Sequence, residues 1–552
     1  MGVRFSFLAL CLGLPLAAAC SGDHVTTPVL AACAAGVGTP ISLGVGAYTT
    51  VDPATDSGCV RFAANASTID STEYLVVAQS AAGTPGQTSP FHLQGGAATA
   101  TAAALSAAAA PMARSQVAID FDRHLRWMAR NRSYPPVPAA LRTAASAAIT
   151  AAPPTVGTLR VFKVCGNLSC STIKNVAAKT RIVGAHIAIY VDTLAPPGGL
   201  DSTALDSLKQ VFDARLFPLD TVAFGGVSDV DSNSVVIVLM TNVVNALVSK
   251  AQCQGAGGAF VAGFFFAGDL DPTFSSQFNH GEVFYSIVAD PNGTLSCAHS
   301  VAELERGTPV TFVHELQHMI SFVQHVLVRG GNTEEGWLDE GLSKYAEELA
   351  GRSYLPGNNP QFTNFVINDL FDAYEYLKAP SGSPLLIPED TGSLAEIGAS
   401  WLFTRYLVDR FGSGLPLKLH QTTLVGSANV AAQTGQPFTT LVTRWALANW
   451  VSDLPAFVSP TELQYSSWQF RTTFASLHAQ DSTDFVRPYP LVPATGGGGA
   501  VSVSGTLTSG SGAYVRVFQA PSGAAFSLHF TRDGTTALPA AMVPRLDIIR
   551  IR

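Results

Sequence analysis

The sequence predicts an α+β protein in which a central domain of strands and helices is flanked by small all-β modules. Short runs that alternate apolar and polar residues fill both ends of the chain. Strand and helix patterns alternate from about residue 156 to 300. From 309 to about 480 the apolar residues recur at helical spacing.

The composition indicates several folded domains and excludes some classes of function. With 552 residues, 47% of them hydrophobic and 13% charged, the chain is too long for one ordinary domain and too apolar for wholesale disorder. A net charge of −8 gives no electrostatic reason to expect nucleic acid as a partner. Only the very start resembles a membrane-targeting segment, which excludes a polytopic membrane protein.

Shifts in composition set the domain boundaries that we expect. In chain order the units are a lipoprotein-type signal peptide over 1–19, a small β-sandwich-like domain over 20–95, an alanine- and proline-rich helical linker or propeptide over 96–155, the central domain over 156–485, and a C-terminal β-module over 486–552.

The first residues indicate export. One positive charge precedes an apolar run from Phe5 to Leu16, which is typical of a secretory signal and too short to span a membrane. Ala17-Ala18-Ala19-Cys20-Ser21 resembles a bacterial lipobox, so we expect a lipid anchor on Cys20 and a place at the outer membrane or cell surface. Plain secretion is the alternative. Membrane contact is expected only through this anchor, and the oligomeric state is left open.

Six cysteines remain after the signal segment and Cys20 are set aside, and an even number in an exported chain suggests disulfides. Six cysteines allow fifteen pairings. Pairing sequence neighbours is the simplest choice because each bond then stays within one domain: 33–59, 165–170 and 253–297.

Apolar spacing predicts the individual elements. A helix is expected over 115–130, between two alanine-rich stretches, where the segment is a spacer or a propeptide. Buried strands are expected over 182–191 and 234–240, with a helix over 205–216 between them. The later helices are expected over 310–328, 334–350, 361–378, 393–411 and 437–452.

One motif dominates the chain: His314-Glu315-Leu316-Gln317-His318, the pattern HExxH. Its flanks are apolar at helical spacing, so positions 314 and 318 lie one turn apart on one face of a buried helix. Two imidazoles placed in this way can share one Zn²⁺. Glu315 lies about 100° round the helix, where it can reach a metal-bound water instead of coordinating directly.

A third protein ligand is needed, because catalytic zinc is usually held by three side chains. Glu340 follows His318 by 22 positions, which is enough for one loop and an antiparallel return of a second helix. We therefore expect Glu340 to complete the site. Gly341 beside it is expected to allow close approach to the first helix.

These motifs resemble a known family. HExxH followed by WLDEGLSKYAEE is similar to the gluzincin metallopeptidases, and HELQHMISF with WLDEGLS and GASWLF is most similar to their hyicolysin-type neutral metallopeptidases, over roughly 180–450. The resemblance implies a two-lobed, thermolysin-like zincin catalytic domain with zinc-dependent endopeptidase activity on proteins or peptides. It implies His314, His318 and Glu340 as zinc ligands and Glu315 as the catalytic residue. It also implies that a strand near 284–288 pairs with the substrate backbone.

Two further positions bear on the family pattern. Glu347 matches a Glu of the related aminopeptidase branch, whereas Lys344 stands where the thermolysin-like branch has Asp. The side chain that orients the two histidines is therefore left open.

Peptide hydrolysis at such a site also needs a donor for the oxyanion. Tyr345 on the second helix is our first candidate, although a tyrosine there is more often a packing residue. The other candidates are Tyr374, Tyr376, Tyr406 and His420.

Two alternatives to an endopeptidase are carried forward. A surface lipoprotein that binds or adheres, with a vestigial zinc site, would suit the flanking β-modules, but all four chemically required residues are present. An aminopeptidase is disfavoured because the GxMEN signature for the substrate amine is absent.

Overall fold

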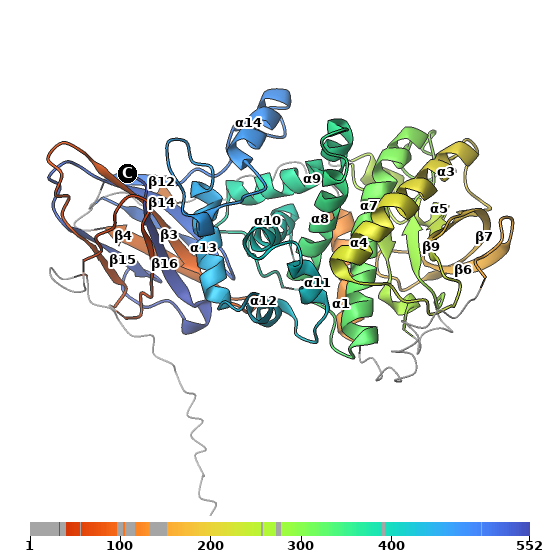
Figure 1. Cartoon of the computed structure of the whole chain (residues 1–552), viewed down its shortest axis with the longest axis horizontal. Helices are drawn as coiled ribbons and strands as arrows, with labels where there is room; N and C mark the ends of the chain where they lie inside the picture. The colour runs from red at the N-terminus through yellow and green to blue at the C-terminus, as the bar shows by residue number, and fades with distance from the viewer. Residues whose placement is uncertain are drawn as a thin grey trace, which may run out of the picture.

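The computed structural model describes residues 33, 40–55, 57–95, 103–104, 116–132, 152–255, 258–271, 278–388, 392–497 and 500–552. The expected signal peptide and Cys20 lie outside the described residues. Figure 1 shows a β-sandwich at one end, helices in the middle and a second sheet region at the other end. This is a mixed α and β architecture, as expected for the α+β class. Within the described ranges, no helix has the length and apolar character needed to cross a bilayer.

The sandwich is built from both ends of the chain. One sheet has the order β1 (Tyr48–Val51), β16 (Pro544–Arg550), β3 (Thr72–Ser80), β14 (Gly512–Gln519) and β12 (Ala494–Gly497). The other has the order β2 (Cys59–Phe62), β15 (Phe526–Thr531), β4 (Thr88–Gly95), β13 (Ser502–Thr508) and β5 (Ala103–Ala104). The sequence suggested separate modules over 20–95 and 486–552. Instead, strands from both segments alternate in the same two sheets around one apolar core.

A buried carboxyl in this sandwich predicts a pH effect on stability. Asp547 on β16 is fully buried and accepts one hydrogen bond, from Thr50 Oγ1 at 2.7 Å. Burial raises the pKa of Asp547 to about 7. The folded protein therefore holds this proton more tightly than the unfolded chain, whose aspartates titrate near pH 3.9. The stability that this group contributes is complete below about pH 3.9 and is lost as the pH rises towards 7.

Asp547→Asn is therefore expected to flatten the pH dependence of unfolding, because the amide mimics the protonated carboxyl. The variant should be more stable than the wild type at pH 8 by roughly 2–4 kcal/mol and closer to it at pH 5. Urea unfolding of both proteins at the two pH values measures this. If the free energy of unfolding changed equally with pH in the two proteins, this prediction would be contradicted.

The second sheet region is a six-stranded mixed sheet. Its order is β10 (Gly263–Phe265), β11 (Val283–Ser286), β9 (Val236–Met240), β8 (Ile187–Asp192), β7 (Ile173–Val183) and β6 (Leu159–Cys165). Strands β8, β9 and β11 are parallel, and the other pairings are antiparallel. β11 has β10 on one side and β9 on the other, so the strand expected to pair with substrate has no free edge. The free edge on this side belongs to β10.

The expected single strand over 182–191 is two strands joined by a turn. The backbone N–H groups of Ala185 and His186 donate to the Asp213 carboxylate at 2.9 and 2.8 Å. A Cβ at Gly184 would lie 1.9 Å from the same carboxylate. This contact fixes a turn between β7 and β8 that the apolar pattern did not indicate.

The helices lie where the apolar spacing predicts them, but the HExxH helix begins at Val301, nine residues before the expected start at 310. α7 (Val301–Phe322) begins at a Ser300 capping box and continues as a π-helical turn to Val328. The expected helices after it are α8 (Gly336–Arg352), α9 (Asn359–Lys378), α10 (Leu394–Phe411) and α13 (Phe438–Val451). The expected helix over 205–216 is the run of α3 (Ser202–Val211), a π-helical turn and α4 (Phe217–Phe224). The sequence analysis missed the shorter helices α5 (Asn242–Asn245), α6 (Lys250–Cys253), α11 (Leu415–His420), α12 (Gly426–Thr434) and α14 (Phe470–Gln480).

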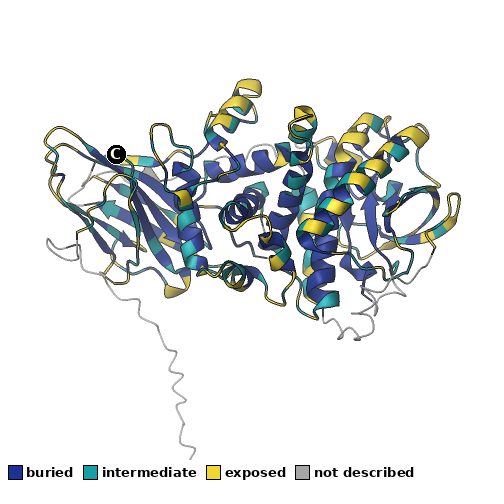
Figure 2. Ribbon diagram, in the orientation of Figure 1, coloured by how far each residue is buried: buried dark blue, intermediate teal, exposed yellow. Residues whose placement is uncertain are grey.

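Gly341 has a different partner from the expected one. A Cβ there would lie 2.5 Å from Thr404 Oγ1 and 2.6 Å from the Ser400 carbonyl oxygen, both on α10. The glycine therefore allows α8 to approach α10, and not the HExxH helix α7. Figure 2 shows that α8 and α10 are largely buried where they pack in the middle of the molecule.

Helix α1 (Gln116–Arg130), which the sequence predicted over 115–130, lies beside α7. The disulfides join Cys33 to Cys59, Cys165 to Cys170 and Cys253 to Cys297, which is the neighbour pairing.

Candidate metal centre

The candidate metal ligands come together as the sequence predicts. His314 and His318 lie one turn apart on α7, and Glu340 faces them from α8. The two Nε2 atoms are 3.2 Å apart, and the Glu340 oxygens lie 3.7 Å from His314 Nε2 and 3.6 Å from His318 Nε2. Ligand atoms about 2.0–2.1 Å from a tetrahedral zinc are about 3.3 Å from one another. The donor atoms therefore have the spacing that one such ion requires.

The tautomers of the two histidines also suit a metal. His314 Nδ1 donates to Glu347 Oε1 at 2.7 Å, and His318 Nδ1 donates to Asp339 Oδ2 at 2.9 Å. With each Nδ1 carrying the proton, the facing Nε2 atoms present lone pairs to the space between them. Two lone pairs 3.2 Å apart repel each other unless a metal ion or a proton lies between them.

Glu347 and Asp339 are therefore the side chains that orient the two histidines. Both carboxylates lie on α8. Asp339 directly precedes Glu340, and Glu347 follows Glu340 by about two turns. Glu347 is itself held by Lys344, whose Nζ lies 3.2 Å from Oε1 and also contacts Asp369 at 3.3 Å. The resemblance to the aminopeptidase branch had pointed to Glu347. Nothing in the sequence analysis pointed to Asp339.

Asp339→Asn is expected to weaken metal binding by about 10–100-fold, because carboxylates that orient a ligating imidazole have effects of this size. The His318 side chain is fully buried, so solvent does not compensate for the loss of the carboxylate charge beside it. Competition with a chromophoric chelator measures the affinity. Glu305→Gln, at an exposed position on α7, the helix that carries His318, is the matched control. Equal affinities in the two variants would show that Asp339 does not act on the metal site.

Glu315 is held beside the ligands by two donors. Its Oε2 accepts from the backbone N–H of Phe265 on β10 at 2.9 Å and from Arg126 Nη2 on α1 at 3.0 Å. Its side chain is only 6% exposed. Burial and the neighbouring charge of Asp122 raise the pKa of Glu315. A carboxylate with a raised pKa beside a metal site has the chemistry of a general base.

The sequence analysis missed the contribution of α1. Asp122 joins Glu315 and His318 in a second group whose ligand atoms all lie within 4.8 Å of one another. Arg126 bridges Asp122, at 2.7 Å, and Glu315. The signal was weak: an acid and a base four residues apart on an otherwise amphipathic helix, far from the HExxH motif in sequence.

A cleft of about 400 Å³ opens onto these groups. It is lined by side chains from α1, α7, α8, α9 and α10 and by the segment that leads into β10. A second cavity of about 310 Å³ continues beside it and shares Phe260, Ala262 and Thr311 with the cleft. Together they give the candidate metal centre access to a ligand larger than water.

None of the expected oxyanion donors is among the residues that line the cleft in the described part of the chain. The Tyr345 ring packs edge-on against Phe224 and lies under Arg405. The hydroxyl groups of Tyr374 and Tyr406 donate to the carbonyls of Arg487 and Glu462. Of the others, Tyr376 stacks on Trp445, and His420 contacts Gln317 through Nε2.

Together these features describe a mixed α and β protein with a buried candidate metal centre, a buried carboxylate beside it and an adjoining cleft. No family model matches the chain. The chain is 25% identical over 252 residues to the neutral metalloprotease ShpI of Staphylococcus hyicus, a match that covers 45% of this chain and 51% of that protein. The chain thus spans about half the length of this relative. The similarity supports a relationship to metalloproteases and suggests protease activity.

Proposed function

We propose that this protein is an exported, zinc-dependent endopeptidase that hydrolyses peptide bonds of proteins, with His314, His318 and Glu340 as ligands and Glu315 as general base. The observation that carries this proposal is the spacing of the three donors around one point, with Glu315 beside them. Two imidazoles and one carboxylate are a ligand set of catalytic zinc sites that keep a position open.

Zinc, when bound, would polarise the peptide carbonyl and lower the pKa of water towards neutrality. The protein supplies the proton transfer. Glu315 accepts a proton from the attacking water and passes it to the leaving amine, for which its raised pKa is suited. Glu347 and Asp339 hold the two imidazoles with Nε2 free for the metal.

The substrate is proposed to be a peptide or protein that lies along the cleft. β10 is one of the two edge strands of the six-stranded sheet, and it lies directly beside Glu315 through the Phe265 N–H contact. An extended peptide can add to such an edge by main-chain hydrogen bonds, which are independent of side-chain identity. In this proposal β10 takes the role that the resemblance had suggested for 284–288. Internal cleavage is favoured over aminopeptidase action by the missing GxMEN signature.

The proposed catalytic unit is two-lobed in the manner of the thermolysin-like zincins, with α7 between the six-stranded sheet and the helices α8–α13. Export is supported by three disulfides, which persist in oxidising compartments. We propose a lipid anchor on Cys20 from the sequence pattern alone.

The test combines metal analysis with cleavage. The purified chain should contain stoichiometric zinc, which a His314→Ala, His318→Ala double variant should lack. The zinc-loaded chain should cut an unfolded protein at internal bonds, even if only at a low rate, as seen by mass spectrometry of the fragments, and a zinc chelator should stop it. Zinc binding at another place, or release of single N-terminal residues only, would overturn the proposal.

A further inference from the structure

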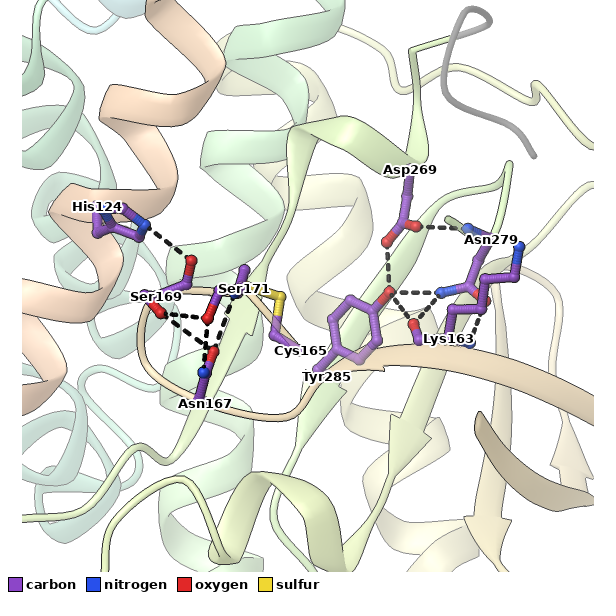
Figure 3. Close-up of a disulfide and its surroundings, with 10 residues drawn as sticks. His124, Lys163, Cys165, Asn167, Ser169, Ser171, Asp269, Asn279 and Tyr285 are labelled. Carbon is purple, nitrogen blue, oxygen red and sulfur yellow. Dashed lines mark hydrogen bonds between the residues drawn. A yellow bond between two sulfur atoms is a disulfide. The ribbon is translucent and has the colours of Figure 1, made fainter. Parts of the chain in front are cut away.

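Helix α1 is docked across the candidate active-site cleft. Gln116 Nε2 donates to the Gly392 carbonyl at 2.8 Å, just before α10. The Phe121 ring packs edge-on against Phe264 of β10 at 5.0 Å. His124 contacts the Ser169 carbonyl in the Cys165–Cys170 disulfide loop at 3.2 Å, as Figure 3 shows. α1 therefore bridges the sheet side and the helical side of the cleft, where a substrate would lie.

Asp122 presents an unused oxygen to the candidate ligands. Its Oδ1 pairs with Arg126 at 2.7 Å, whereas Oδ2 is buried and meets no hydrogen-bond donor in the described part of the chain. Asp122 lies beside Glu340, and its carboxylate belongs to the donor group with Glu315 and His318. The Asp122 carboxylate thus lies close to both Glu315 and Glu340. Buried carboxylates gathered in this way are costly unless a proton or a cation lies between them.

Arg126 forms an ion pair with Glu315, the proposed general base. Its Nη2 lies 3.0 Å from the Glu315 oxygen that also accepts from Phe265 N–H. The guanidinium neutralises the charge of Glu315 and holds this carboxylate oxygen in a charge-assisted hydrogen bond. A water molecule could use this oxygen as its proton acceptor only by displacing Arg126.

We infer that α1 is an inhibitory segment, in which Asp122 is an additional ligand of the metal and Arg126 masks Glu315, so that the described form is latent. This inference rests on the proposed function. Asp122 would take the position that the attacking water needs, and the body of the helix would exclude the peptide. Activity then requires α1 to leave the cleft. In the sequence, alanine-rich stretches flank α1 on both sides.

The test compares Asp122→Ala with Asp120→Ala, which removes an exposed carboxylate two residues earlier on the same helix. Both proteins and the wild type are loaded with Co²⁺, whose visible spectrum reports its ligands. Asp122→Ala should change the spectrum and allow acetohydroxamate to bind the metal, whereas the wild type and Asp120→Ala should exclude this probe. Cleavage of an unfolded protein should rise by about tenfold or more in Asp122→Ala only.

The outcomes separate the two proposals. An unchanged spectrum and equal probe access in Asp122→Ala, with Co²⁺ bound in all three proteins, would overturn the inhibitory role and leave the metal site intact. A spectral change with loss of activity would make Asp122 a working ligand, which also contradicts inhibition. Co²⁺ spectra that the His314→Ala, His318→Ala double variant reproduces would instead refute the proposed metal centre. Arg126→Ala gives an independent check, because it frees Glu315 and should also raise activity.

Discussion

Glu315→Gln is expected to lower the rate of peptide cleavage by about 10²–10⁴-fold, since this is the range that a positioned general base contributes. The amide cannot accept the proton from water, although it has the shape of the carboxylate and its oxygen can still accept from Phe265 N–H. Glu315 is not among the three proposed ligands, so the zinc content should stay the same. The measurement is cleavage of an unfolded protein together with elemental analysis, carried out in the Asp122→Ala background so that latency does not hide the effect.

The matched control is Glu305→Gln, an exposed position on the same helix, which should keep full activity. Equal cleavage by Glu315→Gln and its parent would show that the activity belongs to a contaminant or that the proton is moved by another group. Loss of zinc in Glu315→Gln would instead place Glu315 among the ligands, contrary to the proposed roles.

His318→Ala is expected to abolish both metal binding and activity and also to destabilise the fold. The side chain is fully buried, and its Nδ1 is the partner of Asp339 at 2.9 Å. Burial disfavours the charged form of Asp339, but the hydrogen bond from His318 and the nearby positive charge of Arg126 lower the pKa of Asp339 well below the usual range. Without the imidazole this carboxylate loses a partner inside the protein. The cost of breaking a buried pair in this way is about 3–5 kcal/mol.

Chelator competition and thermal unfolding of the metal-free proteins measure the two effects separately. His186→Ala is a suitable control, because His186 stacks on Phe217 and lines neither the cleft nor the second cavity. It should therefore change neither the metal affinity nor the activity. A His318→Ala variant that keeps stoichiometric zinc with unchanged affinity would refute the proposed ligand set.

The local features of the site could be predicted from the sequence because they depend on helical geometry. The HExxH spacing places two imidazoles on one face of α7, and Glu340 faces them because one loop returns α8 beside α7. The helix ranges followed from apolar spacing for the same reason. The pairing of cysteines with their sequence neighbours is also local.

The features that the sequence analysis missed depend on partners far away in the chain. An alternating pattern shows that a strand has a buried face but does not name its neighbour, so the two β segments were taken as separate modules. Gly341 indicated a close approach without showing whether α7 or α10 supplies the other backbone. Asp122 and Arg126 gave no local sign that their helix docks on Glu315, since this contact spans 189 positions.

The interleaved sandwich has a consequence for a chain that has been cut. Every segment from β6 to α14 is inserted between the strands of the sandwich, and α1 lies on the first connection into that insertion. A break on either side of α1 would divide the protein into two polypeptides, and the disulfides in the described part of the chain would not rejoin them. The backbone ladders of β3 with β14 and β16, and of β4 with β13 and β15, would hold the pieces together. The cut protein would remain one folded particle. The fragment that carries Cys20 would hold the fragment with the proposed metal site, without a covalent link between them.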